Sequence, residues 1–140
     1  MTAAMTATLD GLKIDTLPTL HDPRGALTVA EFGHFVPFSV VRLFYVRKVP
    51  PNTVRGQHAH FRCSQYVICV SGRAQIDFAD GTTERSVILS PGQAVLIDPG
   101  IFATETYLDA DTVLLFLCDR PYEKDDYIHT LDQFLQLRRQ

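Results

Sequence analysis

Two histidines, His58 and His60, are the residues with the clearest capacity for chemistry in this 140-residue sequence. One residue, Ala59, separates them in the stretch Arg55-Gly56-Gln57-His58-Ala59-His60. In an extended strand alternate side chains face the same side, so we expect both imidazoles to enter one pocket. Because histidine titrates near neutral pH, such a pair suits either metal binding or proton transfer.

Short apolar and β-branched stretches, separated by turn residues at fairly regular intervals, surround the histidines. They cover residues 26–31, 40–46, 65–70, 74–78, 83–89, 94–97, 102–107 and 112–117. Between two of them lies Asp80-Gly81, a pair that favours a two-residue hairpin turn. This pattern predicts an all-β sandwich or barrel. Only the end, where apolar residues follow helical spacing from Ile128 to Leu137, predicts a helix.

Length and charge limit the classes of function. A chain of 140 residues fits a single domain, which we expect to span residues 1–140. Its net charge of −3 and its scattered basic residues argue against a nucleic-acid partner. No apolar run is long enough to span a membrane, and no secretory signal begins the sequence. Three cysteines, Cys63, Cys69 and Cys118, without a CxxC motif predict buried, inert thiols in a cytoplasmic protein.

The histidine stretch, with a glycine before it and a glycine turn at Gly72 after it, resembles the first cupin motif. In metal-binding cupins that motif continues to a glutamate, and a later strand supplies a third histidine. Gln65 stands in the glutamate position here, and the later strand at 99–104 contains no histidine. A metal would then lack a third protein ligand. The resemblance implies a metal-free cupin jelly roll (double-stranded β-helix) with a short C-terminal helix.

Five segments, taken in order, resemble the sugar-nucleotide 3,4-ketoisomerases, also called the WxcM-like or FdtA-like family. They are residues 22–27, 36–46, 55–60, 65–72 and 122–128, and the resemblance extends over residues 17–134. It implies an isomerase that moves the carbonyl of a dTDP-linked 4-keto-6-deoxyhexose from C4 to C3 through an enediol, without a bound cofactor. The product would serve deoxysugar and polysaccharide biosynthesis. The resemblance also implies a homodimer whose subunits can exchange N-terminal strands.

Matched motif to motif, the resemblance assigns roles to individual residues. His60 resembles the base that works between C3 and C4, and His58 supports it or binds the sugar. Tyr45 resembles the hydroxyl that relays a proton between the two oxygens. The implied substrate-binding residues are Arg24, Arg42, Arg55, Gln65 and Phe102, of which the arginines suit a diphosphate. Gln65 could instead bond a buried neighbour, and we expect residues 122–127 to close the barrel or meet a second subunit.

Two positions depart from the family pattern. Family members commonly carry Trp-His before Glu-Met on the late strand, where this chain has Phe102-Ala103-Thr104-Glu105, and Pro23 replaces a polar residue before the motif arginine. Both positions resemble ones that govern the face on which C4 is reprotonated, so the C4 configuration of the product stays open. Three other functions stay open too: a dTDP-sugar 3,5-epimerase, a non-catalytic cupin that binds a nucleotide sugar, and a metal-dependent cupin oxygenase.

Overall fold

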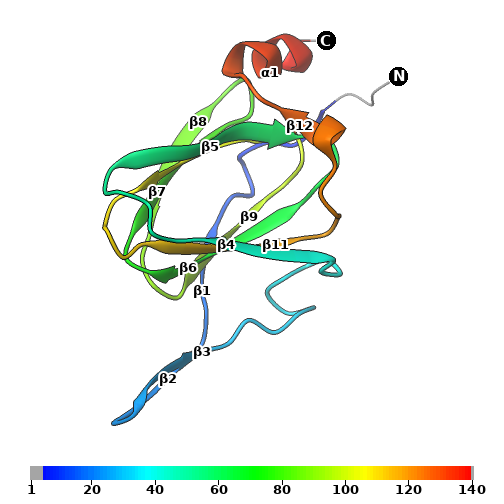
Figure 1. Cartoon of the computed structure of the whole chain (residues 1–140). Coiled ribbons are helices and arrows are strands. Elements are labelled where there is room, and N and C mark those ends of the chain that lie inside the picture. Colours follow the sequence, from blue (N-terminus) through cyan, green and yellow to red (C-terminus); the bar gives the residue numbers. More distant parts are fainter. Residues whose placement is uncertain (1–4, 140) are drawn as a thin grey trace.

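Two antiparallel sheets form the body of the protein in the computed structural model, which describes residues 5–139 (Figure 1). The first five-stranded sheet has the order β1 (Ile14–Thr16), β9 (Gln93–Ile97), β6 (Gln65–Ser71), β11 (Val113–Cys118) and β4 (Arg42–Val46). The second five-stranded sheet has the order β12 (Tyr127–Ile128), β5 (Thr53–His60), β10 (Phe102–Tyr107), β7 (Ala74–Ala79) and β8 (Glu84–Leu89). The predicted all-β jelly roll is confirmed.

The space between the sheets is filled by apolar side chains, because successive residues of a strand face opposite sides. In β7, Ala74, Ile76 and Phe78 are buried while the residues between them are partly exposed. Val67 of β6 and Phe116 of β11 belong to the same buried cluster. Full burial of an aliphatic or phenyl side chain of this size contributes about 1.5–3 kcal/mol. The cluster therefore gives the strands of both sheets a rigid support.

A second apolar cluster lies on the outer face of the first sheet. Tyr66 and Ile68 of β6 and Leu117 of β11 contribute to it, and each alternates with a residue of the inner cluster. Leu17 and Val36, from the chain that precedes β4, pack against these side chains. The N-terminal third of the chain therefore covers part of this outer face.

The loop between β7 and β8 differs from the two-residue turn that the sequence predicts. Four residues, 80–83, separate the last paired residues of the two strands. The Asp80 carboxylate accepts hydrogen bonds from the backbone N–H groups of Thr82 and Thr83 at 2.8 and 2.7 Å, and from that of Leu9 at 3.0 Å. An aspartate that satisfies three backbone donors stabilises the wider loop.

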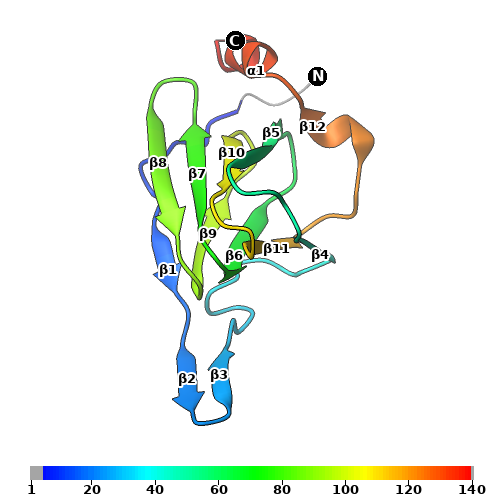
Figure 2. The same ribbon diagram turned by 60° about the vertical axis from the view of Figure 1, so that its left-hand side comes forward.

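A hairpin of β2 (Thr19–Asp22) and β3 (Gly25–Thr28) projects away from the barrel (Figures 1 and 2). Every residue of β3 is exposed, and so is most of β2. Leu20 and Leu27 are 68% and 56% exposed. The projecting hairpin therefore leaves two leucine side chains largely exposed to solvent.

The predicted C-terminal helix is α1 (Leu131–Arg138), at the opposite end of the molecule from the hairpin (Figure 2). Thr130 caps it, because its hydroxyl accepts a hydrogen bond from the backbone N–H of Gln133 at 3.1 Å. Phe134 is fully buried against Ile128 of β12. Among residues 5–139, no helix combines the length and the apolar character needed to cross a membrane.

Candidate active site

Strand β5 positions the two histidines. His60 is only 4% exposed and His58 is partly buried, and their ring centroids lie 5.0 Å apart. The prediction that both imidazoles share one region is therefore confirmed. Just before them, Gly56 and Gln57 have φ values of 90° and 31°, and the pairing of β5 with β10 shifts by one residue. Such a bulge bends a strand and re-aims its side chains, often next to a functional site.

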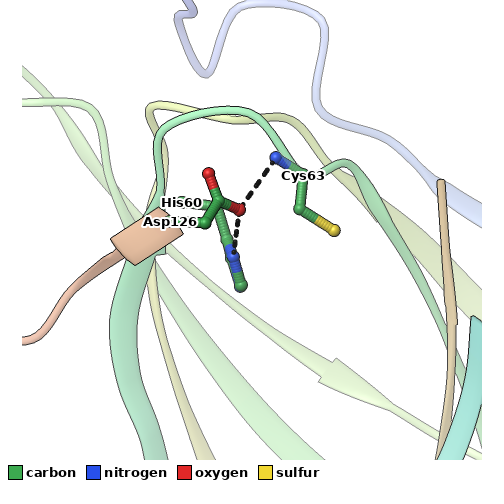
Figure 3. A group of neighbouring side chains, drawn as sticks. All are labelled: His60, Cys63 and Asp126. Atoms are coloured by element: carbon green, nitrogen blue, oxygen red, sulfur yellow. Dashed lines mark hydrogen bonds and ion pairs between the residues drawn. The ribbon is translucent and has the colours of Figure 1, made fainter. Parts of the chain in front are cut away.

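Asp126 holds the ring of His60 in place (Figure 3). Its Oδ2 lies 3.1 Å from His60 Nδ1, and the carboxylate also accepts the backbone N–H groups of Arg62 at 2.7 Å and Cys63 at 3.2 Å. Because the carboxylate accepts at both oxygens, Nδ1 of His60 is the donor, which leaves Nε2 able to accept a proton. Nε2 is buried and has no hydrogen-bond partner among residues 5–139. This is the arrangement of a base oriented by a carboxylate.

Both imidazoles are neutral at pH 7. Burial, together with the neighbouring His60, lowers the pKa of His58 to about 4. Burial also lowers the pKa of His60, against the opposing effect of its hydrogen bond with Asp126. His60 can therefore accept a proton at neutral pH, and Asp126 stabilises the imidazolium that forms.

The side chains of His60, Cys63 and Asp126 could also be considered as metal ligands, since one donor atom of each lies within 4.8 Å of the others. However, His60 and Asp126 direct these atoms at each other. The Asp126 carboxylate also accepts the backbone N–H groups of Arg62 and Cys63, so its oxygens are already used by hydrogen bonds. These three residues therefore suit a hydrogen-bonded network better than a metal centre.

Tyr127 of β12 and Arg42 of β4 complete the surroundings of the histidines. The Tyr127 ring lies 4.5 Å from the ring of His60 and 5.1 Å from that of His58, between centroids. The guanidinium carbon of Arg42 lies 5.9 Å from the ring centroid of Tyr122, which lies 5.7 Å from that of Tyr127. Burial raises the pKa of the Tyr127 phenol, and Arg42 lowers it by less, so the hydroxyl keeps its proton at pH 7. The site thus combines two neutral imidazoles, a phenol and a guanidinium.

Gln65 lies in a row with Cys118 and Arg42 across three strands of the first sheet. Its Nε2 is 3.7 Å from the Cys118 sulfur, so Gln65 bonds a buried neighbour, as its residue type allows. The predicted burial of the three cysteines is confirmed. A hydrogen bond with Cys63, together with the Arg42 charge, lowers the pKa of the Cys118 thiol against the effect of burial. The sequence did not predict this lowered pKa.

Tyr45 and Phe102, two residues that the sequence assigned to the site, face away from the barrel interior. Phe44 and Val46 pack against the inner cluster, so Tyr45 between them points outward and is 56% exposed. Phe102 packs under α1, where its ring centroid lies 5.6 Å from that of Phe134. The expected hydroxyl relay by Tyr45 and the stacking of Phe102 on substrate are thus not supported by their places in one chain.

The three arginines assigned to substrate are not brought together in one chain either. Only Arg42 lies with the histidines. Arg24 sits at the turn of the β2–β3 hairpin, where its guanidinium bonds the Asp22 carboxylate at 2.7 Å. Arg55 is exposed and lines an outer groove together with Tyr45. A diphosphate site built from all three would therefore need more than a single copy of this chain.

Residues 122–127 were expected to close the barrel or to meet a second subunit, and the structure shows the first, because Tyr127 and the following Ile128 pair with β5. They also supply Asp126 and Tyr127 to the site, which sequence reasoning missed. The signal was present, since this stretch was one of the five family-like segments. Asp126 is 66 residues from His60 in the sequence, so spacing gave no indication of the contact between the two side chains.

A second buried carboxyl group, that of Glu105, was also missed. Glu105 lies in β10 and is 4% exposed, and its Oε2 has no partner within the described part of the chain. A side chain at Gly56 would overlap this carboxyl group. Burial raises the pKa of Glu105 to about 7, although its own backbone and Arg55 lower it. Glu105 therefore places a carboxyl group that ionises only near neutral pH beside the bulge that precedes His58.

Comparisons with known proteins agree with this geometry. The model of a family described as FdtA: WxcM-like, C-terminal, matches residues 10–139. The TDP-4-oxo-6-deoxy-alpha-D-glucose-3,4-oxoisomerase of Aneurinibacillus thermoaerophilus is 28% identical over 123 residues, which is 87% of this chain and 88% of that protein. The structure of QdtA, a sugar 3,4-ketoisomerase from Thermoanaerobacterium thermosaccharolyticum in complex with TDP, has a TM-score of 0.86 at 26% identity, over 94% of this chain and 97% of that one. A 4-keto-6-deoxy sugar epimerase from Streptomyces spheroides, at 19% identity and a TM-score of 0.75 over 86% of this chain and 69% of that one, shares the fold alone.

Proposed function

The chain belongs to the FdtA family, described as WxcM-like, C-terminal, and from this premise we propose that it is a 3,4-ketoisomerase acting on a dTDP-linked 4-keto-6-deoxyhexose. The observation that carries the proposal is the buried pair of His60 and Asp126, which leaves a neutral imidazole nitrogen able to accept a proton. The reaction needs such a base, because the proton at C3 is acidic only through the neighbouring C4 carbonyl.

The proposed mechanism consumes and releases no net proton. His60 Nε2 removes the C3 proton, and the electron pair moves to the C4 carbonyl oxygen to form an enediolate. A proton then passes from the oxygen on C3 to the oxygen on C4. The C3 carbonyl forms as the imidazolium of His60 gives a proton to C4. Arg42 supports the enediolate, since a guanidinium near the developing negative charge lowers its energy.

The other candidate functions have less support. A 3,5-epimerase shares only the fold with this chain. A metal-dependent oxygenase would need a third ligand beside His58 and His60, at a position where Gln65 bonds Cys118. A purely binding cupin is favoured only by the two departures from the family pattern, Pro23 and Ala103. Neither departure removes His60, the proposed base.

We further propose that the protein is a homodimer in which the β2–β3 hairpin of each subunit packs on the other. Leu20 and Leu27 expose apolar surface on the hairpin, and Leu43 and Tyr45 do so on the outer face of the first sheet. Contact between these surfaces would cover both. It would also carry Arg24 toward the partner subunit, which accounts for an arginine with no role in its own barrel.

Light scattering after size exclusion tests the dimer. The expected result is twice the chain mass for the wild type and a monomer for a variant with Leu20→Asp and Leu27→Asp. A wild-type monomer at micromolar concentration would refute the arrangement. A variant that stays dimeric would show that the hairpin does not make the interface.

Proton NMR of the protein with dTDP-4-keto-6-deoxyglucose in deuterated water tests the activity. The expected outcome is a 3-keto product that carries deuterium at C4. In ordinary water the coupling between the C4 and C5 protons then gives the C4 configuration, which the departures at Pro23 and Ala103 leave undecided. A substrate unchanged at C3 and C4 would overturn the proposed isomerase.

A further inference from the structure

The isomerisation contains one step that His60 does not perform, the transfer of a proton from the oxygen on C3 to the oxygen on C4. A group for this step must give and accept a proton while it faces the same sugar carbons as the base. Tyr45 points away from the barrel, and Phe44 beside it, which points inward, has no hydroxyl. Phe44 is stacked on Phe116 with ring centroids 4.6 Å apart, so this part of the wall is apolar.

Tyr127 lies directly opposite His60 in the pairing of β12 with β5. Side chains that are paired across two strands project to the same face, with Cβ atoms about 4.5–5.5 Å apart. The ring distances of 4.5 Å to His60 and 5.1 Å to His58 agree with this placement. Tyr127 therefore shares the face of the sheet from which the base acts.

The Tyr127 ring is held by aromatic neighbours on several sides. His129 stacks on it with an interplanar angle of 7° and a centroid distance of 5.6 Å, and Tyr122 lies at 5.7 Å. The two active-site histidines pack on it as well. A ring fixed in this way keeps its hydroxyl in one position, which proton transfer requires.

Arg42, from the opposite sheet, is the cationic residue near Tyr127. Its guanidinium carbon lies 5.9 Å from the ring centroid of Tyr122, which lies 5.7 Å from that of Tyr127. A guanidinium has donors only, so it leaves the phenol O–H available for another acceptor. Burial keeps the phenol protonated by raising its pKa, although Arg42 opposes this.

We propose that Tyr127 is a catalytic residue whose phenol gives a proton to the C4 oxygen and takes one from the C3 oxygen. One O–H bond breaks and one forms at the phenol, so Tyr127 ends the cycle unchanged and no oxidant or reductant is needed. The proposal rests on the proposed ketoisomerase function. It assigns the oxygen-to-oxygen transfer to Tyr127 and leaves the carbon proton to His60.

The Tyr127→Phe variant tests the assignment because the two proton transfers can be measured separately by NMR in deuterated water. Exchange of the C3 proton in the remaining 4-keto substrate reports the base, and formation of the 3-keto sugar reports the complete reaction. The expected result is a fall in 3-keto formation of about 10²-fold or more, the usual size for a lost acid–base group. Exchange at C3 should stay close to the wild-type rate.

Tyr66→Phe is the matched control. The Tyr66 hydroxyl bonds the Asp15 carboxylate at 2.7 Å, and Tyr66 packs in the outer cluster, so its loss should change neither rate. Full 3-keto formation by Tyr127→Phe would overturn the proposal. Loss of both rates by a Tyr127→Phe protein with wild-type circular dichroism would also overturn it, because Tyr127 would then only position His60. A wild type that shows neither rate would instead refute the isomerase function itself.

Discussion

Two buried carboxyl groups lie beside strand β5, one at its last residue and one near its middle, and they differ in their hydrogen-bond partners. Asp126 lies beside His60 and accepts hydrogen bonds from the imidazole and from two backbone N–H groups. Glu105 lies against Gly56, and its Oε2 is without a partner among residues 5–139. Burial alone therefore does not fix the role of a carboxyl group. Its hydrogen-bond partners decide whether it orients a base, as Asp126 does, or ionises only near neutral pH, as Glu105 does.

The difference between the two carboxyl groups is expected to be largest in catalysis. Asp126→Asn should lower kcat by about 10²–10⁴-fold. The amide cannot act as the negative acceptor that fixes the His60 tautomer and stabilises the imidazolium. Turnover is measured by NMR of the 3-keto product. Asp125→Asn is the control, because its exposed carboxylate bonds Arg62 at 3.2 Å at the surface. Equal kcat values for the two variants would remove the special role of Asp126.

Glu105→Gln should change stability rather than kcat. An ordinary glutamate titrates at 4.5 and Glu105 at about 7, so the folded state binds more protons between these values. Stability of the wild type should therefore fall as pH rises from 4.5 to 7, by about 3 kcal/mol in total, since one pKa unit corresponds to about 1.4 kcal/mol. Glu105→Gln has no carboxyl group to ionise, so its stability should not fall in this way, and at pH 8 the variant should be more stable than the wild type.

Urea unfolding at pH 5 and pH 8 measures this effect. Glu84→Gln, an exposed substitution of the same chemistry on β8, is the control and should not show the pH-dependent gain. A difference between Glu105→Gln and the wild type that is the same at both pH values would argue against a neutral Glu105.

Gly56→Ala should destabilise the protein by about 2 kcal/mol or more, because it combines a strained φ with an overlap. Gly56 has a φ of 90°, and a Cβ there would collide with the Glu105 carboxyl group. Gly33→Ala provides the comparison, since Gly33 has a φ of 88° and nothing within 4 Å of its Cβ position. Equal unfolding free energies of the two variants would mean that Glu105 does not pack against the bulge.

The smallest expected effect is on the pH profile of kcat/KM. Burial keeps the pKa values of His58 and His60 below 6.5. The acid limb of the profile should therefore lie below pH 6.5, whereas a base with the ordinary pKa of 6.5 would lose about three-quarters of its activity at pH 6. An acid limb centred at 6.5 would contradict the buried, neutral base.

The strands and the histidine pair could be predicted because both follow from local spacing. A period of two residues marks the strands, and one intervening residue puts His58 and His60 on one face. The choice between Phe44 and Tyr45 could not be made in this way. A shift of one residue in a strand exchanges its two faces, and only the packing of both sheets decides which residue points inward.

The contacts of Asp126, Tyr127 and Glu105 could not be predicted for a different reason. Asp126 is 66 residues from His60 in the sequence, and its role follows from the closure of the barrel by β12. The Glu105 environment depends on a bulge in another strand. Such long-range arrangements leave no spacing pattern in one sequence.

The most direct test of the active-site assignment is the His60→Asn variant with dTDP-4-keto-6-deoxyglucose in deuterated water, followed by NMR at C3 and C4. His34→Asn, an exposed histidine outside the barrel, is the control. If His60 is the base held by Asp126, His60→Asn should lose both the exchange of the C3 proton and the formation of the 3-keto sugar, while the control keeps both. Full turnover by His60→Asn would contradict this assignment.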